Sequence, residues 1–353
     1  MNCSGFFRRS TWIAFALACA PSARAELLVG DAGDQTPAAV LTYADSAAGA
    51  ATPLGSFSTA AGNGIAALQD PSSLTFDPLE NVVYVADFYG QAIRVYRPGA
   101  VGNVAPLRTL NPSLLGQPRQ VALSTLHDEL IIATGCCVIT YGRYTYGTQA
   151  VPSRYLPPSY TPEGRSTRLN NPGGIVLRTS SDEIIIPDTG NGPNNTYFGV
   201  VLFFPRSLTG NSSPYRTLEG AQTLLGTSAS HISQDEVHDE IYVSSQDSAT
   251  YPYGLRISTF AGSASGNVAP LRSIGGDATQ LEDIHQIFYD DISETLYVSV
   301  GGENGVAPKV LVFARGANGN VAPDRTIIPN GASFSRPEGL TVVFDDLFHD
   351  NFE

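Results

Sequence analysis

Short apolar runs of three to five residues recur along most of the chain, with turns rich in Gly, Pro, Asn and Asp between them. Residues 82–85, 184–186 and 296–298 are clear examples. No segment places its apolar residues at the 3.6-residue spacing of an amphipathic helix. Runs this short, with turn residues on both sides, are typical of β-strands. The pattern therefore predicts an all-β chain.

A repeated motif sets the period of these strands. Gly-Asn-Val-Ala-Pro-x-Arg occurs at residues 102–108, 266–272 and 319–325, and looser copies complete a set of six. The prolines of the six copies, 46 to 62 residues apart, are Pro53, Pro106, Pro152, Pro214, Pro270 and Pro323. Each unit holds four predicted strands, the last of which contains the proline. Four strands in six copies predict a six-bladed β-propeller of four-stranded antiparallel blades.

The two ends of the chain supply different strands of one unit. Residues 26–30 match a second strand, whereas residues 336–344 match an additional first strand. Pairing these segments would build one blade from both ends and tie down termini that otherwise fray. We therefore expect a single propeller domain over residues 26–344, closed by pairing the N-terminal strands with the C-terminal strand.

The motif prolines and the arginines after them have a structural explanation. The fourth strand is the outer edge of a blade, where Pro is tolerated because its missing N–H is not needed by the ladder. Five units carry an Arg two residues after the Pro, and the first unit has Gly55 there; the arginines are Arg108, Arg154, Arg216, Arg272 and Arg325. We expect these charges to discourage edge-to-edge pairing, in preference to binding a ligand.

Residues 70–96, with Tyr-Val-Ala-Asp at 84–87 and Ala-Ile-Arg-Val-Tyr at 92–96, resemble a repeat of the NHL-type propellers. The Gly of that family's Pro-x-Gly-Ile start is kept at Gly174 and Gly339, and its strand-end Asp at Asp87 and Asp188. The resemblance implies the propeller fold. NHL-like propellers include extracellular sensor domains, protein-binding scaffolds and a few metal-dependent enzymes, so the resemblance implies no single activity.

The starts of the six predicted first strands should surround the mouth of the central channel. Aligning them gives two rings: Ser72, Arg119, Gly173, Ser230, His285 and Glu338, then Ser73, Gln120, Gly174, His231, Gln286 and Gly339. Convergent polar groups of this kind are typical of a small-molecule site, although a hydrated channel mouth is the simpler alternative. The predicted ligand-binding residues are Arg119, Gln120, His231, His285, Gln286 and Glu338.

A metal-dependent hydrolase or lyase at this mouth, lactonase-like or amidating-lyase-like, is the alternative function. A zinc site needs three protein ligands, and His231 and His285 have no third His on a first strand. A calcium site needs several oxygen ligands, and Glu338 is the only carboxylate in the two rings. No nucleophile elbow, phosphate loop or dinucleotide fingerprint occurs. We therefore predict a ligand- or protein-binding module without catalytic residues or cofactor, Ca²⁺ and Zn²⁺ lacking a full ligand set.

Cys136 and Cys137 are adjacent at the end of a predicted second strand, in the loop that faces the channel mouth beside Arg119. In an oxidising compartment the pair predicts a vicinal disulfide, and two reduced, buried thiols are the alternative. Two turn-rich insertions, residues 188–195 and 246–254, are expected to be ordinary loops. The first lacks the closing Glu of an EF-hand, and the second carries Tyr251 and Tyr253.

Composition and charge limit the partners. The chain has 20 basic and 33 acidic residues and a formal net charge of −13, so it offers no electrostatic footprint for nucleic acid or an anionic membrane surface. No run after the first 25 residues is apolar for long enough to be a membrane helix. We expect an unidentified protein or small molecule as partner. The acidic-aromatic tail, residues 345–353, is expected to be the remainder of a hairpin, with a sorting signal as the alternative.

The first 25 residues predict a cleavable signal peptide. Arg8 and Arg9 precede an apolar segment, residues 11–20, that is too short to span a bilayer, and Ala23-Arg24-Ala25 is an A-x-A cleavage site. We therefore expect a secreted or periplasmic protein whose mature chain starts at Glu26. Lipoprotein processing at Cys19 is the alternative.

The intact mass of the exported protein tests this prediction. We expect a mass that corresponds to residues 26–353, because signal peptidase cuts after the last small residue of the A-x-A site. A chain that retains residues 1–25 after export, or one that begins at a lipidated Cys19, would contradict it.

Overall fold

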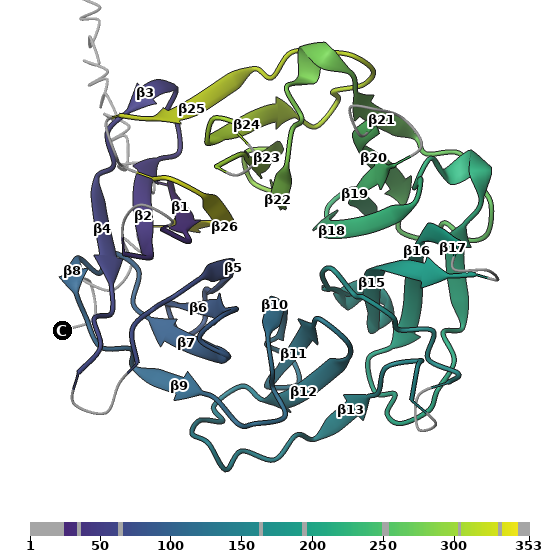
Figure 1. Ribbon diagram of the computed structural model, residues 1–353, viewed down its shortest axis with the longest axis horizontal. Helices are drawn as coiled ribbons and strands as arrows, with labels where there is room; N and C mark the ends of the chain where they lie inside the picture. Colours follow the sequence, from purple (N-terminus) through teal and green to yellow (C-terminus); the bar gives the residue numbers. More distant parts are fainter. Residues whose placement is uncertain are drawn as a thin grey trace, which may run out of the picture.

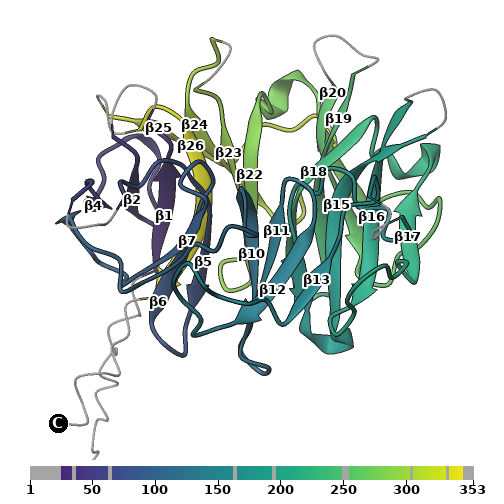
Figure 2. The same ribbon diagram turned by 60° about the horizontal axis from the view of Figure 1, so that its bottom comes forward.

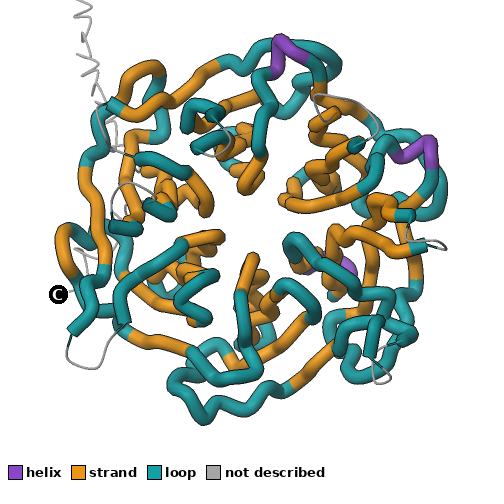
Figure 3. The backbone as a smooth tube through the Cα atoms, viewed as in Figure 1, coloured by secondary structure: helices purple, strands orange, loops and turns teal. Residues whose placement is uncertain are grey.

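Six antiparallel sheets stand around a central axis, each with four strands running from the axis outward (Figure 1). The computed structural model describes residues 25–33, 37–62, 66–161, 165–192, 196–248, 254–302, 305–330 and 334–344. Strands and turns make up nearly all of this part of the chain (Figure 3), and the side view shows the sheets packed as the walls of a short cylinder (Figure 2). The predicted six-bladed β-propeller is confirmed.

The strands follow the predicted order within every blade. From the inside outward, blade 1 contains β26 (Pro337–Phe344), β1 (Ala25–Asp31), β2 (Ala39–Ala44) and β4 (Gly55–Ser58), and blade 2 contains β5 (Pro71–Asp77), β6 (Val82–Asp87), β7 (Ala92–Tyr96) and β9 (Arg108–Leu110). Blade 3 contains β10 (Pro118–Ser124), β11 (Glu129–Thr134), β12 (Val138–Gly142) and β13 (Arg154–Leu156), and blade 4 contains β14 (Val176–Arg178), β15 (Glu183–Asn191), β16 (Tyr197–Pro205) and β17 (Arg216–Glu219). Blade 5 contains β18 (Ser228–Asp235), β19 (Glu240–Asp247), β20 (Gly254–Ala261) and β21 (Arg272–Gly275), and blade 6 contains β22 (Ile284–Asp290), β23 (Thr295–Val300), β24 (Lys309–Ala314) and β25 (Arg325–Pro329).

Blade 1 is built from both ends of the chain, as the sequence predicts. β1 pairs antiparallel with β2 on one side and with β26 on the other, and Leu28 lies opposite Thr341 in the second ladder. The chain therefore closes the ring with its own last strand, which becomes the innermost strand of blade 1.

The hydrophobic core is divided into six clusters, one between each pair of neighbouring blades. Side chains of a strand alternate between its two faces, so the apolar second and third strands of a blade supply one cluster with one face and the next cluster with the other. In blade 4, for example, Ile184 and Ile186 pack toward blade 3, whereas Ile185 packs toward blade 5.

The motif prolines lie before the outer strands and not within them, which corrects the prediction. Each outer strand begins two residues after its proline, as at Pro106 and β9 or Pro270 and β21. The prolines therefore shape the turn that enters the edge strand, and they are not what protects that edge.

The outer edges are covered by a glycine of the following blade. The backbone of this glycine pairs parallel to the outer strand: Gly266 N donates to Thr217 O at 2.7 Å, and Gly319 N to Ser273 O at 2.8 Å. The six glycines are Gly49, Gly102, Gly147, Gly210, Gly266 and Gly319. All have φ between 63° and 85°, a region that glycine enters without steric cost. We call each of these contacts a blade clasp.

The Asn of the motif strengthens the blade clasp. Asn267 Oδ1 accepts from the backbone N–H of Gln222 at 2.8 Å, and Asn320 Oδ1 from that of Ala278 at 2.8 Å, in each case on the preceding blade. The clasp of Gly49 on β25, in register with Ile327, joins blade 1 to blade 6 and closes the ring a second time.

Four of the five motif arginines form ion pairs, which the sequence did not predict, and their effect on edge-to-edge pairing stays a prediction. Arg108 pairs with Glu80 at 2.7 Å and Arg272 with Glu240 at 2.5 Å, in each case with an acid at or near the start of the second strand. The guanidinium of Arg325 donates instead to the carbonyl oxygen of Asp45 at 2.6 Å. Arg108 and Arg272 therefore fix the outer strand to the second strand of the same blade, whereas Arg325 of blade 6 binds the backbone of blade 1.

Some predictions concern residues outside the described part of the chain. These are the signal peptide through residue 24, the tail at residues 345–353, and the tips of both insertions, including Tyr251 and Tyr253. Among the described residues, no helix is long and apolar enough to cross a membrane.

A buried ion pair stabilises the strand end of blade 2. Arg94 Nε lies 2.7 Å from Asp87 Oδ2, and their side chains are 2% and 0% exposed. Asp87 Oδ1 also accepts from the backbone N–H groups of Gln69 and Asp70. A buried carboxylate without its arginine would retain its desolvation cost and lose the compensating charge.

We expect Arg94→Met to lower the free energy of unfolding by about 3–5 kcal/mol, because it leaves the Asp87 carboxylate buried and unpaired. Urea denaturation measures this. Arg97→Met, at an exposed position three residues on, is the control and should change stability little. Adding Asp87→Asn to Arg94→Met should restore part of the loss; equal effects of the two arginine variants would contradict this account.

Candidate functional site

The predicted mouth residues converge on one pocket of about 320 Å³ at the end of the central channel. It contains every member of the first predicted ring, Ser72, Arg119, Gly173, Ser230, His285 and Glu338, together with Gln120, His231 and Gln286 of the second ring. The alignment of the first strands therefore places these residues correctly, and ligand binding by them stays a prediction.

Two of the predicted binding residues form the floor of the pocket. Gln120 reaches from blade 3 to the backbone of two other blades: its Nε2 donates to Ile232 O at 3.2 Å, and its Oε1 accepts from Ile175 N at 3.1 Å. A Cβ at Gly174 would lie 2.3 Å from that Oε1. The glycine in this ring position thus leaves room for the glutamine side chain.

Gln286 makes the corresponding bridge from blade 6. Its Nε2 donates to Ser73 Oγ at 3.1 Å on blade 2, and its Oε1 accepts from Leu340 N at 2.5 Å on blade 1. The amides of both glutamines are therefore already engaged by the protein. They separate the mouth from the lower channel, a cavity of about 470 Å³ that both glutamines also line.

Arg336 and Glu338 belong to a network on one side of the pocket. Arg336 Nε lies 3.2 Å from Glu338 Oε1, and its Nη2 lies 3.3 Å from Asp70 Oδ2. His285 Nδ1 is 3.3 Å from the same Glu338 oxygen, and its Nε2 is 3.1 Å from Gly301 O. The positive charge of Arg336 is thus balanced within the pocket wall.

Arg119 is the contrasting cation of the pocket. Its guanidinium makes no hydrogen bond or ion pair with any residue in the described ranges, and its side chain is half-buried. Burial lowers the pKa of Arg119, while the charges of Asp188 and Cys136 oppose that effect. A guanidinium in a concave, partly desolvated position without a partner is suited to an anion.

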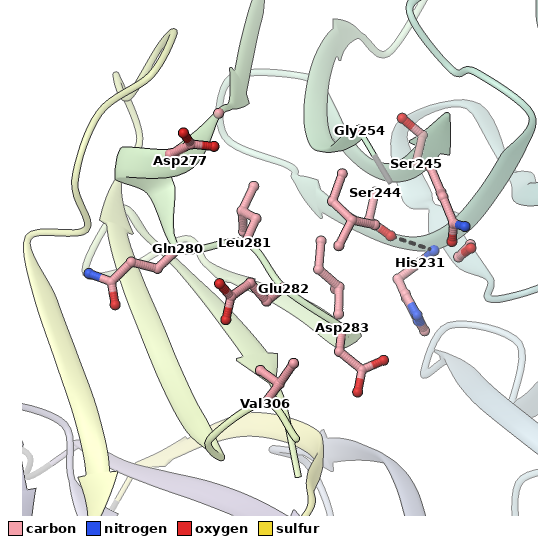
Figure 4. Close-up of a pocket in the computed structure, with 15 residues that line it drawn as sticks. His231, Ser244, Ser245, Gly254, Asp277, Gln280, Leu281, Glu282, Asp283 and Val306 are labelled. Atoms are coloured by element: carbon pink, nitrogen blue, oxygen red, sulfur yellow. Dashed lines mark hydrogen bonds between the residues drawn. The ribbon is translucent and has the colours of Figure 1, made fainter. Parts of the chain in front are cut away.

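His231 contributes a neutral imidazole to the pocket. Burial lowers its pKa to about 3, and the charges of His285 and Arg119 act in the same direction. Its backbone N–H donates to Ser244 Oγ at 2.9 Å, as drawn in Figure 4. At neutral pH this ring can donate or accept one hydrogen bond without adding charge.

A larger cavity of about 720 Å³ adjoins the mouth between blades 5 and 6 (Figure 4). Both cavities include Ser230, His231 and Ile284, so they meet at the start of β18 and β22. The larger cavity also carries acidic side chains, among them Asp277 and Asp283, and Asp283 Oδ2 lies 3.6 Å from His285 Nε2 of the mouth.

Cys136 and Cys137 lie in the turn between β11 and β12 as free thiols. Their Sγ atoms are 2.6 Å apart, and Thr134 Oγ1 contacts both, at 3.5 Å from Cys136 and 3.1 Å from Cys137. Cys137 is buried in the cluster between blades 2 and 3, and Cys136 is partly exposed. The predicted disulfide therefore stays a prediction, with the sulfurs placed side by side.

Five lining residues were not predicted: Asp70, Phe88, Tyr89, Ile284 and Arg336. Asp70 and Arg336 come directly before the prolines that begin β5 and β26, and this shared position was a usable signal. The rings of Phe88 and Tyr89 meet edge to face at 5.0 Å in the hairpin after β6, where the sequence shows only a turn.

The metal ligands of the alternative function do not assemble in the described part of the chain. It contains no group of three or more His, Cys, Asp or Glu side chains placed to hold a metal ion. Of the three residues considered, His285 and Glu338 are in contact, with His285 Nδ1 3.3 Å from Glu338 Oε1.

Comparison with known proteins supports the fold and no family. No protein-family model matches the chain, and no curated protein matches it. A chain in a crystal structure of a nidogen/laminin complex aligns with a TM-score of 0.57 and 16% identity, covering 90% of this chain and 98% of that one. The β-propeller architecture is shared with that chain. The NHL resemblance stays a prediction.

Two further solved structures align less well. The WD40 β-propeller domain of Doa1 has a TM-score of 0.49 and 11% identity, covering 86% of this chain and 79% of that one. Hydrazine synthase of Kuenenia stuttgartiensis has a TM-score of 0.47 and 10% identity, covering 78% of this chain and 70% of that one.

Asp188 provides a test of the electrostatics near the mouth. Its fully buried carboxylate accepts from the backbone N–H groups of Asn170 and Asn171, and burial raises its pKa to about 6. The folded protein therefore binds this proton at a higher pH than the unfolded chain does. The contribution of Asp188 to the free energy of unfolding therefore falls as pH rises from about 4 to about 6.

In wild type we expect the free energy of unfolding to fall by about 3 kcal/mol between pH 4 and pH 7 because of Asp188, and we expect Asp188→Asn to remove this fall. Denaturant unfolding at the two pH values, compared between wild type and variant, measures the difference. Asp277→Asn, at an exposed carboxylate, is the matched control. Parallel pH profiles for wild type and Asp188→Asn would contradict the expectation.

Proposed function

We propose that this protein is a binding module whose channel mouth holds a small organic carboxylate on Arg119. The observation that carries the proposal is the half-buried guanidinium without a partner among the described residues, in a pocket whose other arginine, Arg336, is already ion-paired. A planar guanidinium can bind both oxygens of a carboxylate at once.

The other lining residues support an anion with an apolar body. Phe88, Tyr89 and Ile284 offer apolar surface, and His231 is neutral at pH 7, so it can donate a hydrogen bond without competing for the charge. A pocket of about 320 Å³ matches a small ligand. Gln120 and Gln286 support the pocket from below and are not expected to contact the ligand.

A binding module that holds a protein partner is the second candidate function. The nidogen chain was solved in a complex with laminin, but a likeness at this identity concerns the fold alone. We also propose that the domain works outside the cytoplasm after cleavage behind Ala25, which rests on the signal-peptide pattern of the sequence.

A thermal-shift screen with matched pairs tests the carboxylate proposal. The probes are acetate, benzoate and hexanoate at millimolar concentration, each compared with its neutral amide. We expect at least one carboxylate to raise Tm more than its amide does, because only the anion pairs with Arg119. In Arg119→Gln the Kd of that carboxylate should rise roughly ten- to hundredfold, which corresponds to the loss of a charge-assisted contact worth about 1.5–3 kcal/mol.

Arg97→Gln removes the same charge at an exposed position on the opposite end of blade 2 and should bind the carboxylate like wild type. The absence of any shift that depends on Arg119 would overturn the proposal. Stabilisation by Zn²⁺ or Ca²⁺ that is lost in His285→Ala would favour the metal-dependent alternative instead.

A further inference from the structure

The turn that holds the two cysteines lies against Arg119. A Cβ added to Gly135, the residue before Cys136, would be 3.7 Å from Arg119 Nη2 and 3.8 Å from its Nε. The same arginine and Cys136 interact electrostatically, each shifting the pKa of the other. The turn that carries the thiols therefore lies beside Arg119, whose guanidinium has no hydrogen-bond or ion-pair partner among the described residues.

The pair has the asymmetry of an attacking and a resolving thiol. Cys136 is partly exposed and Cys137 is buried. The pKa of Cys136 is lowered to about 6, mainly by its hydrogen bond with Cys137 and further by Thr134, Tyr160 and Arg119, against the effect of burial. The pKa of Cys137 is raised, chiefly by Cys136 and then by burial.

Tyr155 and Tyr160 are the other titratable groups that face the sulfurs, and Asp188 faces Arg119 from blade 4. The pKa values of both tyrosines are raised by burial and by the thiol pair, so they stay neutral at pH 7. Among these groups, Cys136 is the one whose charge beside Arg119 changes with thiol oxidation.

We propose that Cys136 and Cys137 are a reversible dithiol–disulfide couple that regulates anion binding at Arg119. The effect on anion binding rests on the proposed function, whereas the formation of the disulfide does not. With the thiols reduced, the Cys136 thiolate competes with an anionic ligand for Arg119. With the disulfide formed, that charge is gone and Arg119 is available.

The chemistry requires a disulfide oxidant, for which oxidised glutathione is the probe. The Cys136 thiolate attacks one sulfur of oxidised glutathione, forms a mixed disulfide and releases one glutathione thiolate. Cys137 then attacks Cys136 Sγ, its proton passes to the departing second glutathione, and the ring closes. Two protein thiols are oxidised, and one glutathione disulfide is reduced to two thiols.

Adjacency makes this disulfide reversible. Neighbouring Cα atoms are about 3.8 Å apart across a trans peptide, whereas ordinary disulfides join Cα atoms roughly 4.4–6.8 Å apart. A bond formed outside the usual range is more easily reduced and belongs to the labile class. The two Sγ atoms already lie 2.6 Å apart, and Cys137 Sγ is in contact with Thr134 at the end of β11. Closure of the disulfide therefore needs little movement of the turn.

Peptide mapping tests the couple without any ligand. Trypsin should release residues 120–143 as one peptide, which contains both cysteines and no other. After incubation with oxidised glutathione and then iodoacetamide, we expect this peptide to lack both alkyl groups and two hydrogens, and prior dithiothreitol to restore double alkylation. Double alkylation after oxidation, or a persistent glutathione adduct, would overturn the couple.

The contact with Arg119 has its own readout. The pH dependence of the rate of Cys136 alkylation should shift to higher pH in Arg119→Gln, because the positive charge of Arg119 lowers the pKa of the thiol. Arg97→Gln is the control and should follow wild type. An unchanged profile in Arg119→Gln would overturn the regulatory link.

Binding of the carboxylate that raises the Tm of wild type in the thermal screen is then measured in both redox states. We expect the oxidised protein to bind it more tightly than the reduced protein at pH 7.5, with a lower Kd, because the reduced Cys136 thiolate competes for Arg119. Cys136→Ser should bind it alike with and without oxidant. Equal Kd values for oxidised and reduced wild type would overturn the regulation. A failed carboxylate screen with a positive alkylation shift would count against the proposed function alone.

Discussion

Closure of the ring is the constraint on which the rest of this structure depends. A four-stranded sheet has two edges, and each exposed edge is a row of unpaired backbone groups. The inner strands are ordered because β26 returns to pair with β1, and the outer strands because each accepts a blade clasp from the next blade. The Gly49 clasp on β25 joins the outer strand of blade 6 to blade 1, so the ring is closed at the outer strands as well as at the inner ones.

The clasps explain the most repetitive part of the sequence. Gly supplies a positive φ beside the preceding outer strand, Asn caps the segment that follows that strand, and Arg pairs with an acid of its own blade. Each residue of the motif thus satisfies a different group, and the motif recurs because every blade presents the same edge. A chain without a disulfide framework depends on such pairing and on the six interblade clusters for its stability.

Closure also produces the mouth. The six first strands start at the same end of the axis, so residues from 72 to 338 meet in one pocket. Arg336 is ion-paired there, and the amides of Gln120 and Gln286 already hydrogen-bond to other blades. Arg119 lines the pocket without a hydrogen-bond or ion-pair partner among the described residues, and the turn that carries Cys136 lies beside it. One unbalanced charge thereby connects the binding proposal with the redox inference.

The sequence by itself determined the number of blades, the order of their strands and the ring of mouth residues, because turn residues, apolar alternation and a repeat period are local properties. It did not reveal that Gln120 and Gln286 cross the channel, or that Arg108 and Arg272 are ion-paired. The blade clasps were also missed, and the prolines were placed in the wrong part of the edge. Those features join residues of different strands or blades. Their partners are decided only when closure brings distant backbone and side-chain groups within hydrogen-bonding distance, where each buried polar group must find a partner.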